Sequence, residues 1–324
     1  MSAPRVVALG GGHGLAASLK ALRQVTPHLT AVVTVADDGG SSGRLREELG
    51  ILPPGDLRMA LAALADGDRT WEQLLQHRFA GSGPLAGHAV GNLLLAGLGE
   101  VVGDPVVALD LIGRLVGARG RVLPMSCSPL EIVAEVTGLD PLRPAAVSVV
   151  RGQVAVASTP GQVTDVWLEP LDAVACEQAL EAVREADWVV LGPGSWFTSV
   201  LPHLLVPQLR RALATTRARR LVCLNLEAQP GETDGFSPEE HLDVLARYAP
   251  ELVLDVVVAD DSAVVDRRSL TERVQATGGR LLLAPIARGD GTPRHHPDRL
   301  ASAYAHILLE DGTDSTIPEA QAWR

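Results

Sequence analysis

The chain has 324 residues, of which 46% are hydrophobic and 3% aromatic, so it can bury a large core built mostly from Leu, Val and Ala. Its 28 Lys and Arg residues against 39 Asp and Glu residues give a net charge of −11. That balance argues against a general nucleic-acid binder or a membrane-surface binder, because both need a basic face, but it leaves room for a local pocket that holds a small anion.

The first elements along the chain predict a strand, glycine turn, helix, strand unit. Val6–Leu9 is an apolar run that ends in five residues of which four are glycine, Leu15–Leu22 has helical spacing, and Ala31–Ala36 is a second apolar run. Because the sequence enters the first strand directly, we expect no signal peptide. The most apolar stretch, Leu93–Val116, carries four charged residues and is too polar to span a bilayer. We therefore expect a cytoplasmic protein with no membrane span.

The rest of the chain alternates helices and strands. Residues 66–117 read as mainly helical and 122–167 as short strands and turns. Further helices are expected at 173–185, from about Pro238 with Ser237 as N-cap, at 270–276 and at 300–309, and further strands at 188–191, 221–224, 252–258 and 281–283.

The strands are continuous apolar runs rather than alternating ones, which is typical of a parallel sheet covered on both faces. We predict an α/β fold with a Rossmann-like, mostly parallel sheet, helices on both faces and a smaller inserted α/β subdomain. The whole chain is expected to be a single domain in which about 66–168 is the inserted region and 311–324 is a loose polar tail. The three cysteines, Cys127, Cys176 and Cys223, are odd in number and lack CxxC spacing, so a disulfide framework or a zinc site is not expected and a reducing cytosol fits.

The first glycine turn is a candidate phosphate site. It lies where a strand hands over to a helix, so the backbone can approach an anion at the helix N-terminus. The candidate residues are Gly11, Gly12, His13 and Gly14. The third glycine of G-x-G-x-x-G would fall on Leu15, which makes a nicotinamide-dependent dehydrogenase a weak alternative. The simpler alternative is a tight turn that binds no ligand.

The stretch after the second strand is the strongest candidate site. Ligands of open α/β sheets bind at the carboxyl ends of strands, where Asp37 and Asp38 fall. One of them could accept a ribose hydroxyl or ligate a divalent cation, but adjacent side chains on an extended chain point apart, so joint ligation of one ion is not expected. A flexible loop rich in N–H donors, two arginines and a carboxylate after a Pro-Pro-Gly turn would complete a diphosphate site, at Gly39, Gly40, Ser41, Ser42, Gly43, Arg44, Arg46, Asp56 and Arg58. The alternative is a solvated polar turn.

Two further motifs could contribute to the same site. His88 and Asn92 are four residues apart and would share a helix face, from which they could contact a base or sugar, although a histidine is as often a structural hydrogen-bonding residue. A second strand, glycine turn, helix arrangement supplies Gly192, Pro193, Gly194, Ser195, Thr198 and Ser199 as a second anion site. G-x-S-x-G is absent, which disfavours a hydrolase with Ser195 as nucleophile.

Taken together, these motifs resemble the gluconeogenesis factor (YvcK) family within the CofD-like superfamily. They are VTVADDGGSSGRLREELG, PPGDLR, HRF…GHAVGNLLLAGL, RGRVLP, LGPGSWFTSVLPHLLVP and QPGETDGFSPEEHL. They match in order from the first strand to about Leu242. Two positions depart from the family pattern: His13 replaces the threonine of GGTG, and Met59 replaces the asparagine of GDxRN.

The resemblance implies a cytoplasmic protein that binds a UDP-sugar, chiefly UDP-N-acetylglucosamine, and that regulates cell shape and wall synthesis during growth on gluconeogenic carbon sources. A binding protein of this kind would require no cofactor and no catalytic residue. We expect protein partners in wall synthesis, a homo-oligomer and no nucleic-acid partner. The alternative is a magnesium-dependent 2-phospho-L-lactate transferase, which moves phospholactate from a nucleotide-diphosphate donor to a deazaflavin. The stretch from Gln229 to Phe236 favours the binding branch over the transferase.

Overall fold

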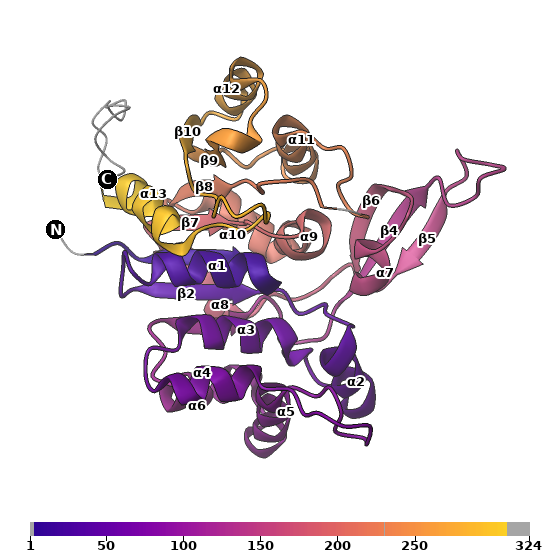
Figure 1. The fold of residues 1–324 in the computed structure, drawn as a ribbon, viewed down its shortest axis with the longest axis vertical. Coiled ribbons are helices and arrows are strands. Elements are labelled where there is room, and N and C mark those ends of the chain that lie inside the picture. Colours follow the sequence, from indigo (N-terminus) through magenta and orange to yellow (C-terminus); the bar gives the residue numbers. More distant parts are fainter. Residues whose placement is uncertain (1–2, 230, 310–324) are drawn as a thin grey trace.

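Seven parallel strands form the central sheet of the computed structural model, which describes residues 3–229 and 231–309 (Figure 1). The strand order is β10-β9-β8-β7-β1-β2-β3. The strands of this sheet are β1 (Val6–Gly10), β2 (Leu29–Val33), β3 (Arg121–Pro124), β7 (Trp188–Leu191), β8 (Arg219–Cys223), β9 (Val256–Asp260) and β10 (Arg280–Ala284). Every residue of β1, β7 and β9 is buried, which explains their continuous apolar sequences.

Helices cover both faces of this sheet. Along the sheet, the connection from β1 to β2 runs towards β3, and the connection from β7 to β8 runs the opposite way, towards β10. Because both crossovers are right-handed, α1 and α10 lie on opposite faces of the sheet. On these faces α1 packs against α13, and α10 packs against α8. The helices of the core are α1 (Gly12–Leu22), α8 (Glu177–Glu185), α9 (Pro202–Leu205), α10 (Pro207–Thr215), α11 (Pro238–Tyr248), α12 (Arg267–Ala276) and α13 (Pro297–Leu309), with a π-helical turn η1 (Trp196–Val200) and a 3-10 turn η2 (Asp261–Ala263).

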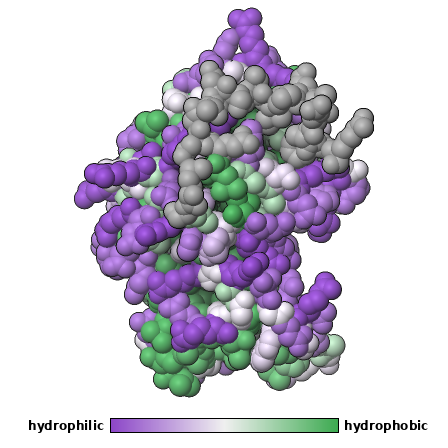
Figure 2. All heavy atoms as spheres, turned by 90° about the vertical axis from the view of Figure 1, so that its left-hand side faces the viewer, coloured by the Kyte–Doolittle hydropathy of each residue, from purple (hydrophilic) through white to green (hydrophobic). Residues whose placement is uncertain are grey.

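A second helical group lies beside α1, at the lower end of Figure 1. It comprises α2 (Gly40–Leu49), α3 (Pro54–Leu64), α4 (Arg69–Gln76), α5 (Val90–Val102) and α6 (Pro105–Leu115). Helix α3 is its centre, because it packs against α1, α4, α5 and α6. Figure 2 shows apolar side chains gathered at this lower end, and Val101, Val107 and Leu115 are exposed there.

A small antiparallel sheet stands apart from the central one, at the right of Figure 1. Its order is β5-β4-β6, and its elements are β4 (Glu131–Thr137), β5 (Ser148–Arg151), α7 (Gln153–Ala157) and β6 (Gln162–Glu169). We call residues 131–169 the insert. Within the predicted inserted region of about 66–168, β3 joins the central sheet, so only the later part of that region forms a separate layer.

The predicted fold class is confirmed: a mostly parallel, Rossmann-like sheet with helices and a smaller inserted subdomain. Ser237 caps α11, where its hydroxyl accepts from the Glu240 N–H in a capping box. The prediction of a flexible loop at Gly39–Gly43 was wrong, because α2 begins at Gly40. The predicted turn at Pro53–Gly55 is the start of α3, where the fixed φ of Pro54 suits the first helical position.

The predicted tail at 311–324 lies outside the described residues. Within the described ranges, no helix combines the length and the apolar character that a membrane crossing requires.

Candidate functional site

The N-terminus of α2 opens on a pocket of about 740 Å³ at the carboxyl end of the central sheet. Gly40 opens α2 with a φ of +49°, and no side chain at the N-cap, Gly39, covers the first-turn N–H groups. The pocket is lined by Asp38, Gly40, Ser41, Gly43, Arg44, Arg46, Glu47, Arg78, Gly87 and Glu131. Its size lies within the range of small-molecule sites.

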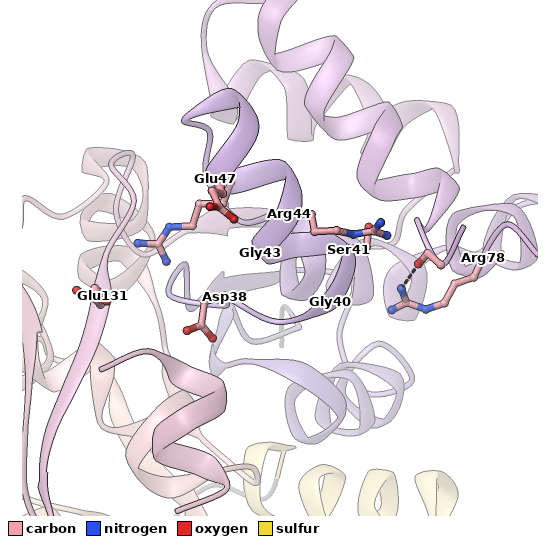
Figure 3. A pocket seen from close by; sticks show the side chains of 10 residues that line it. Asp38, Gly40, Ser41, Gly43, Arg44, Glu47, Arg78 and Glu131 are labelled. Atoms are coloured by element: carbon pink, nitrogen blue, oxygen red, sulfur yellow. Dashed lines mark hydrogen bonds between the residues drawn. The ribbon is translucent and has the colours of Figure 1, made fainter. Parts of the chain in front are cut away.

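Three arginines line this pocket. Arg44 and Arg46 come from α2, and Arg78 comes from the loop after α4. Arg44 donates to the Ala86 carbonyl at 2.8 Å and Arg78 to the Gly87 carbonyl at 2.8 Å, so one short loop holds both guanidinium groups. In Figure 3 both side chains lie on one side of the pocket, and Asp38 and Glu131 lie on the other. Such an arrangement suits a ligand with a diphosphate at one end and hydroxyl groups at the other.

Asp37 and Asp38 have separate environments, as expected for neighbours on an extended chain. Asp37 Oδ1 accepts from the Gly39 N–H at 2.9 Å, and its half-buried carboxylate also bonds Ser42. Asp38 Oδ1 instead accepts from the Val154 N–H at 2.9 Å, at the start of α7 in the insert. Asp38 therefore ties the insert to the pocket rim, and Asp37 does not reach the same place.

The Asp56 carboxylate lies against the N-terminus of α1, which like α2 begins in a glycine-rich turn. It accepts from the Gly12 N–H, and a Cβ added at Gly11 would overlap its Oδ2 atom. Burial raises the pKa of Asp56 to about 7, with a further contribution from the charge of Asp37. Asp56 Oδ2 is buried with no hydrogen-bond partner among the described residues. The first glycine turn is thus occupied by a carboxylate of the chain itself.

Arg58, His88 and Asn92 form a buried network around Ser41. Ser41 Oγ lies 3.0 Å from His88 Nδ1 and accepts from Asn92 Nδ2 at 3.0 Å, and Arg58 Nε donates to Asn92 Oδ1 at 2.9 Å. Arg58 also donates to Gln76. The expectation that His88 and Asn92 share a helix face was wrong, because α5 begins at Val90 and His88 precedes it. The two side chains meet at Ser41 instead.

The second glycine turn packs against the first. A Cβ on Gly14 would overlap the carbonyl of Pro193, which shows how closely the two turns approach, and Asn225 makes two hydrogen bonds to the backbone of Gly194. Ser199 lies against Gly11. These contacts fill the crevice between β1 and β7, where the direction of the chain connections reverses and where ligands of such sheets usually bind.

Ser195 and Thr198 engage a buried carboxylate that we did not predict as part of the site. Ser195 Oγ donates to Glu232 Oε1 at 2.6 Å and also contacts Thr198. Burial raises the pKa of Glu232. Since Glu232 stands inside the QPGETDGF motif, that motif was the available signal.

His13 lies outside the main pocket. It lines a separate pocket of about 430 Å³ between α1, α3 and the end of α4, together with Lys20, Arg58, Gln76 and Arg78. Arg78 lines both pockets.

The prediction omitted four other residues of the main pocket: Glu47, Arg78, Gly87 and Glu131. Arg78 was present in the HRF motif, but its role depends on how the loop after α4 folds back onto α2. Glu131 gave no sequence signal, because it opens an ordinary strand. In the described part of the chain, no three His, Cys, Asp or Glu side chains cluster in a way that could hold a metal ion.

Comparison with known proteins places this Rossmann-like fold in a family. The family model described as 2-phospho-L-lactate transferase CofD matches residues 6–279, and the chain belongs to that family. Within it, the chain belongs to the gluconeogenesis factors. It is 54% identical over 322 residues to a putative gluconeogenesis factor of Mycobacterium tuberculosis, covering 97% of this chain and 93% of the relative. It is 35% identical to a gluconeogenesis factor of Listeria innocua, covering 94% and 96%.

A solved structure agrees. A protein of the UPF0052 family from Bacillus halodurans superimposes with a TM-score of 0.84 at 34% identity, over 96% of this chain and all of that one.

Proposed function

We propose that this protein binds a UDP-sugar, chiefly UDP-N-acetylglucosamine, in the pocket at the N-terminus of α2. The proposal is carried by one observation: Arg44, Arg46 and Arg78 line the same pocket as the uncapped start of α2. A helix N-terminus and guanidinium groups are the two protein features that best stabilise a diphosphate.

The remaining candidate residues act as supports of this pocket. Ser41 is held by His88 and Asn92, and Ser42 Oγ accepts from the Gly55 N–H at 3.0 Å, which ties α2 to α3. Glu47 and Glu131 supply carboxylate acceptors for the hydroxyl groups of a sugar.

The cellular role that fits this binding is regulation of cell shape and wall synthesis during gluconeogenic growth, because the bound sugar nucleotide is a wall precursor and the relatives carry the name gluconeogenesis factor. In this proposal the protein acts in the cytoplasm, through protein partners in wall synthesis. It acts as a homo-oligomer, for which the exposed Val101, Val107 and Leu115 on α5 and α6 offer an apolar face.

Isothermal titration calorimetry tests the binding directly. UDP-N-acetylglucosamine should bind with micromolar affinity, roughly −8 kcal/mol, in EDTA. UDP alone and N-acetylglucosamine alone are the matched controls, and each should bind more weakly. Absence of heat with every UDP-sugar would refute the proposal.

A second function is favoured by one observation: the Asp37–Asp56 pair. The two carboxylates interact, and Asp56 Oδ2 lacks a partner among the described residues, so they are the residues that would hold a magnesium ion. The ion would neutralise a nucleotide diphosphate for a phospholactate-type transfer to a deazaflavin. Mass spectrometry of a reaction with magnesium, such a donor and a deazaflavin separates this transferase from the binding protein, which yields no product.

A further inference from the structure

Two chain segments connect the insert to the central sheet, and we call them the neck. Residues 125–130 leave the end of β3 and residues 170–176 return to the start of α8. The two segments lie side by side, because the Cys176 N–H donates to the Met125 carbonyl at 3.0 Å. Each segment carries one cysteine, Cys127 on the way out and Cys176 on the way back.

The thiols of Cys127 and Cys176 contact one another across the neck. Cys176 is the N-cap of α8; its carbonyl accepts from the Ala179 N–H at 3.0 Å, and its thiol donates to Gln178 Oε1 at 3.2 Å. The contact between the two thiols lowers the pKa of Cys176 and raises the pKa of Cys127. The two sulfurs are therefore neighbours that interact with one another.

Oxidants can reach this pair from one side. Cys127 is exposed and forms part of the wall of an apolar groove of about 210 Å³, together with Pro105 and Pro129, whereas Cys176 is 1% exposed. The third cysteine, Cys223, is fully buried in β8, and burial raises its pKa to about 12. The chain thus contains one reactive pair and one inert thiol.

We propose that Cys127 and Cys176 form a reversible disulfide that fixes the neck of the insert. A peroxide is the oxidant. The sulfur of the exposed Cys127 attacks one peroxide oxygen, the O–O bond breaks, and a sulfenic acid forms while the thiol proton leaves with the second oxygen as water. The second thiol then attacks the sulfenic sulfur, the S–S bond forms, and the sulfenic oxygen leaves as water with the proton of that thiol. A dithiol reductant reverses the step.

The disulfide would act on one wall of the main pocket. The insert begins with Glu131, which lines that pocket. Near the start of its helix α7, the Val154 N–H donates to Asp38 at the rim of the same pocket. The bond would close a loop of roughly 50 residues that contains the whole insert, which restricts the ways in which the insert can open away from the core. Oxidation would therefore hold the pocket wall in place.

Hydrogen peroxide treatment of the intact protein tests the proposal, with a reduced sample beside it. We expect the oxidised protein to lose two hydrogens in mass, to yield one joined peptide that contains Cys127 and Cys176, and to recover after dithiothreitol. Amide exchange in residues 131–169 should become at least about tenfold slower. The variants Cys127→Ser and Cys176→Ser should lose both effects, and Cys223→Ala should keep them.

Three results would overturn the proposal. They are sulfenic or sulfinic acid on Cys127 with no joined peptide, a disulfide only between two molecules, or a joined peptide with unchanged exchange in the insert. The mass change, the joined peptide and the amide exchange are all measured on the wild-type protein. The proposal can therefore be tested even if a serine variant fails to fold. None of these readouts depends on a UDP-sugar, so they remain valid if the proposed binding function fails.

Discussion

Helices α1 and α2 begin alike and end up with different surroundings. Each follows one of two neighbouring strands, has a glycine as N-cap and opens with a glycine of positive φ, +56° at Gly12 and +49° at Gly40. The start of α1 is filled by the Asp56 carboxylate and by the second glycine turn. The start of α2 opens on a pocket with three arginines.

The same backbone arrangement has two different surroundings: close packing of turns at α1 and, in our proposal, an anion at α2. What separates them is whether another part of the chain already bonds an N–H group at the start of the helix. Four predictions test this distinction, and they are given in order of decreasing expected effect.

Replacement of Gly14 by alanine should have the largest effect. The new Cβ would overlap the Pro193 carbonyl, and neither backbone can easily move, so we expect a loss of about 3 kcal/mol or more in unfolding free energy and a melting temperature lower by about 6 °C or more. Gly97→Ala in α5 is the matched control, because no atom lies within 4 Å of its added Cβ, and it should not destabilise. A variant with unchanged melting would show that the two turns do not pack as closely as described.

Replacement of Asp56 by asparagine should change the pH dependence of stability. The pKa of Asp56 is raised by burial to about 7, so the folded state holds a proton between about pH 4 and pH 7 that the unfolded state has lost, and the wild type loses stability as the pH rises through that window. The variant should lack this loss and be more stable at pH 8 by on the order of 2–4 kcal/mol.

Denaturant melts at several pH values measure this effect, and the same melts with magnesium extend the test. If the wild type alone gains stability from the ion, Asp37 and Asp56 hold it and the transferase reading is favoured. Parallel pH profiles of the two proteins would contradict the assigned burial of Asp56.

Replacement of Arg44 by alanine should weaken UDP-N-acetylglucosamine binding about 10- to 100-fold, because a charge-assisted pair to a diphosphate contributes on the order of 1.5–3 kcal/mol. Thermal stability should change little, since the hydrogen bond to the Ala86 carbonyl is exposed. Arg114→Ala, on α6 outside the pocket, is the control and should bind normally. Normal calorimetric binding by the Arg44 variant would place the diphosphate elsewhere.

Replacement of Asp38 by asparagine should have the smallest effect, a change in affinity of less than about threefold in EDTA. Asparagine keeps the oxygen that accepts from the Val154 N–H, and it removes a negative charge that repels a diphosphate. Titrations with and without magnesium measure this. Should affinity disappear in EDTA and return with magnesium, a bridging metal is required and the transferase function gains support.

Much of the fold could be read from the sequence, because it depends on local patterns. Continuous apolar runs such as Val6–Leu9 predicted buried parallel strands, and Ser237 as N-cap ahead of Pro238 predicted the start of α11. Element boundaries were less certain. The strand expected at 252–258 is β9 at Val256–Asp260, because Leu252 and Leu254 are buried without pairing in the sheet.

The sequence by itself determined which residues stand at the ends of the strands, and therefore that Asp37, Asp38 and the glycines lie at one edge of the sheet. Only the tertiary structure decided which of them face a pocket. Asp56 reaches Gly12, Arg78 reaches the pocket beside α2, and Cys127 reaches Cys176, each across more than thirty residues of chain. Such contacts depend on how helices and loops pack against one another, and packing between distant segments leaves no period or spacing in the sequence.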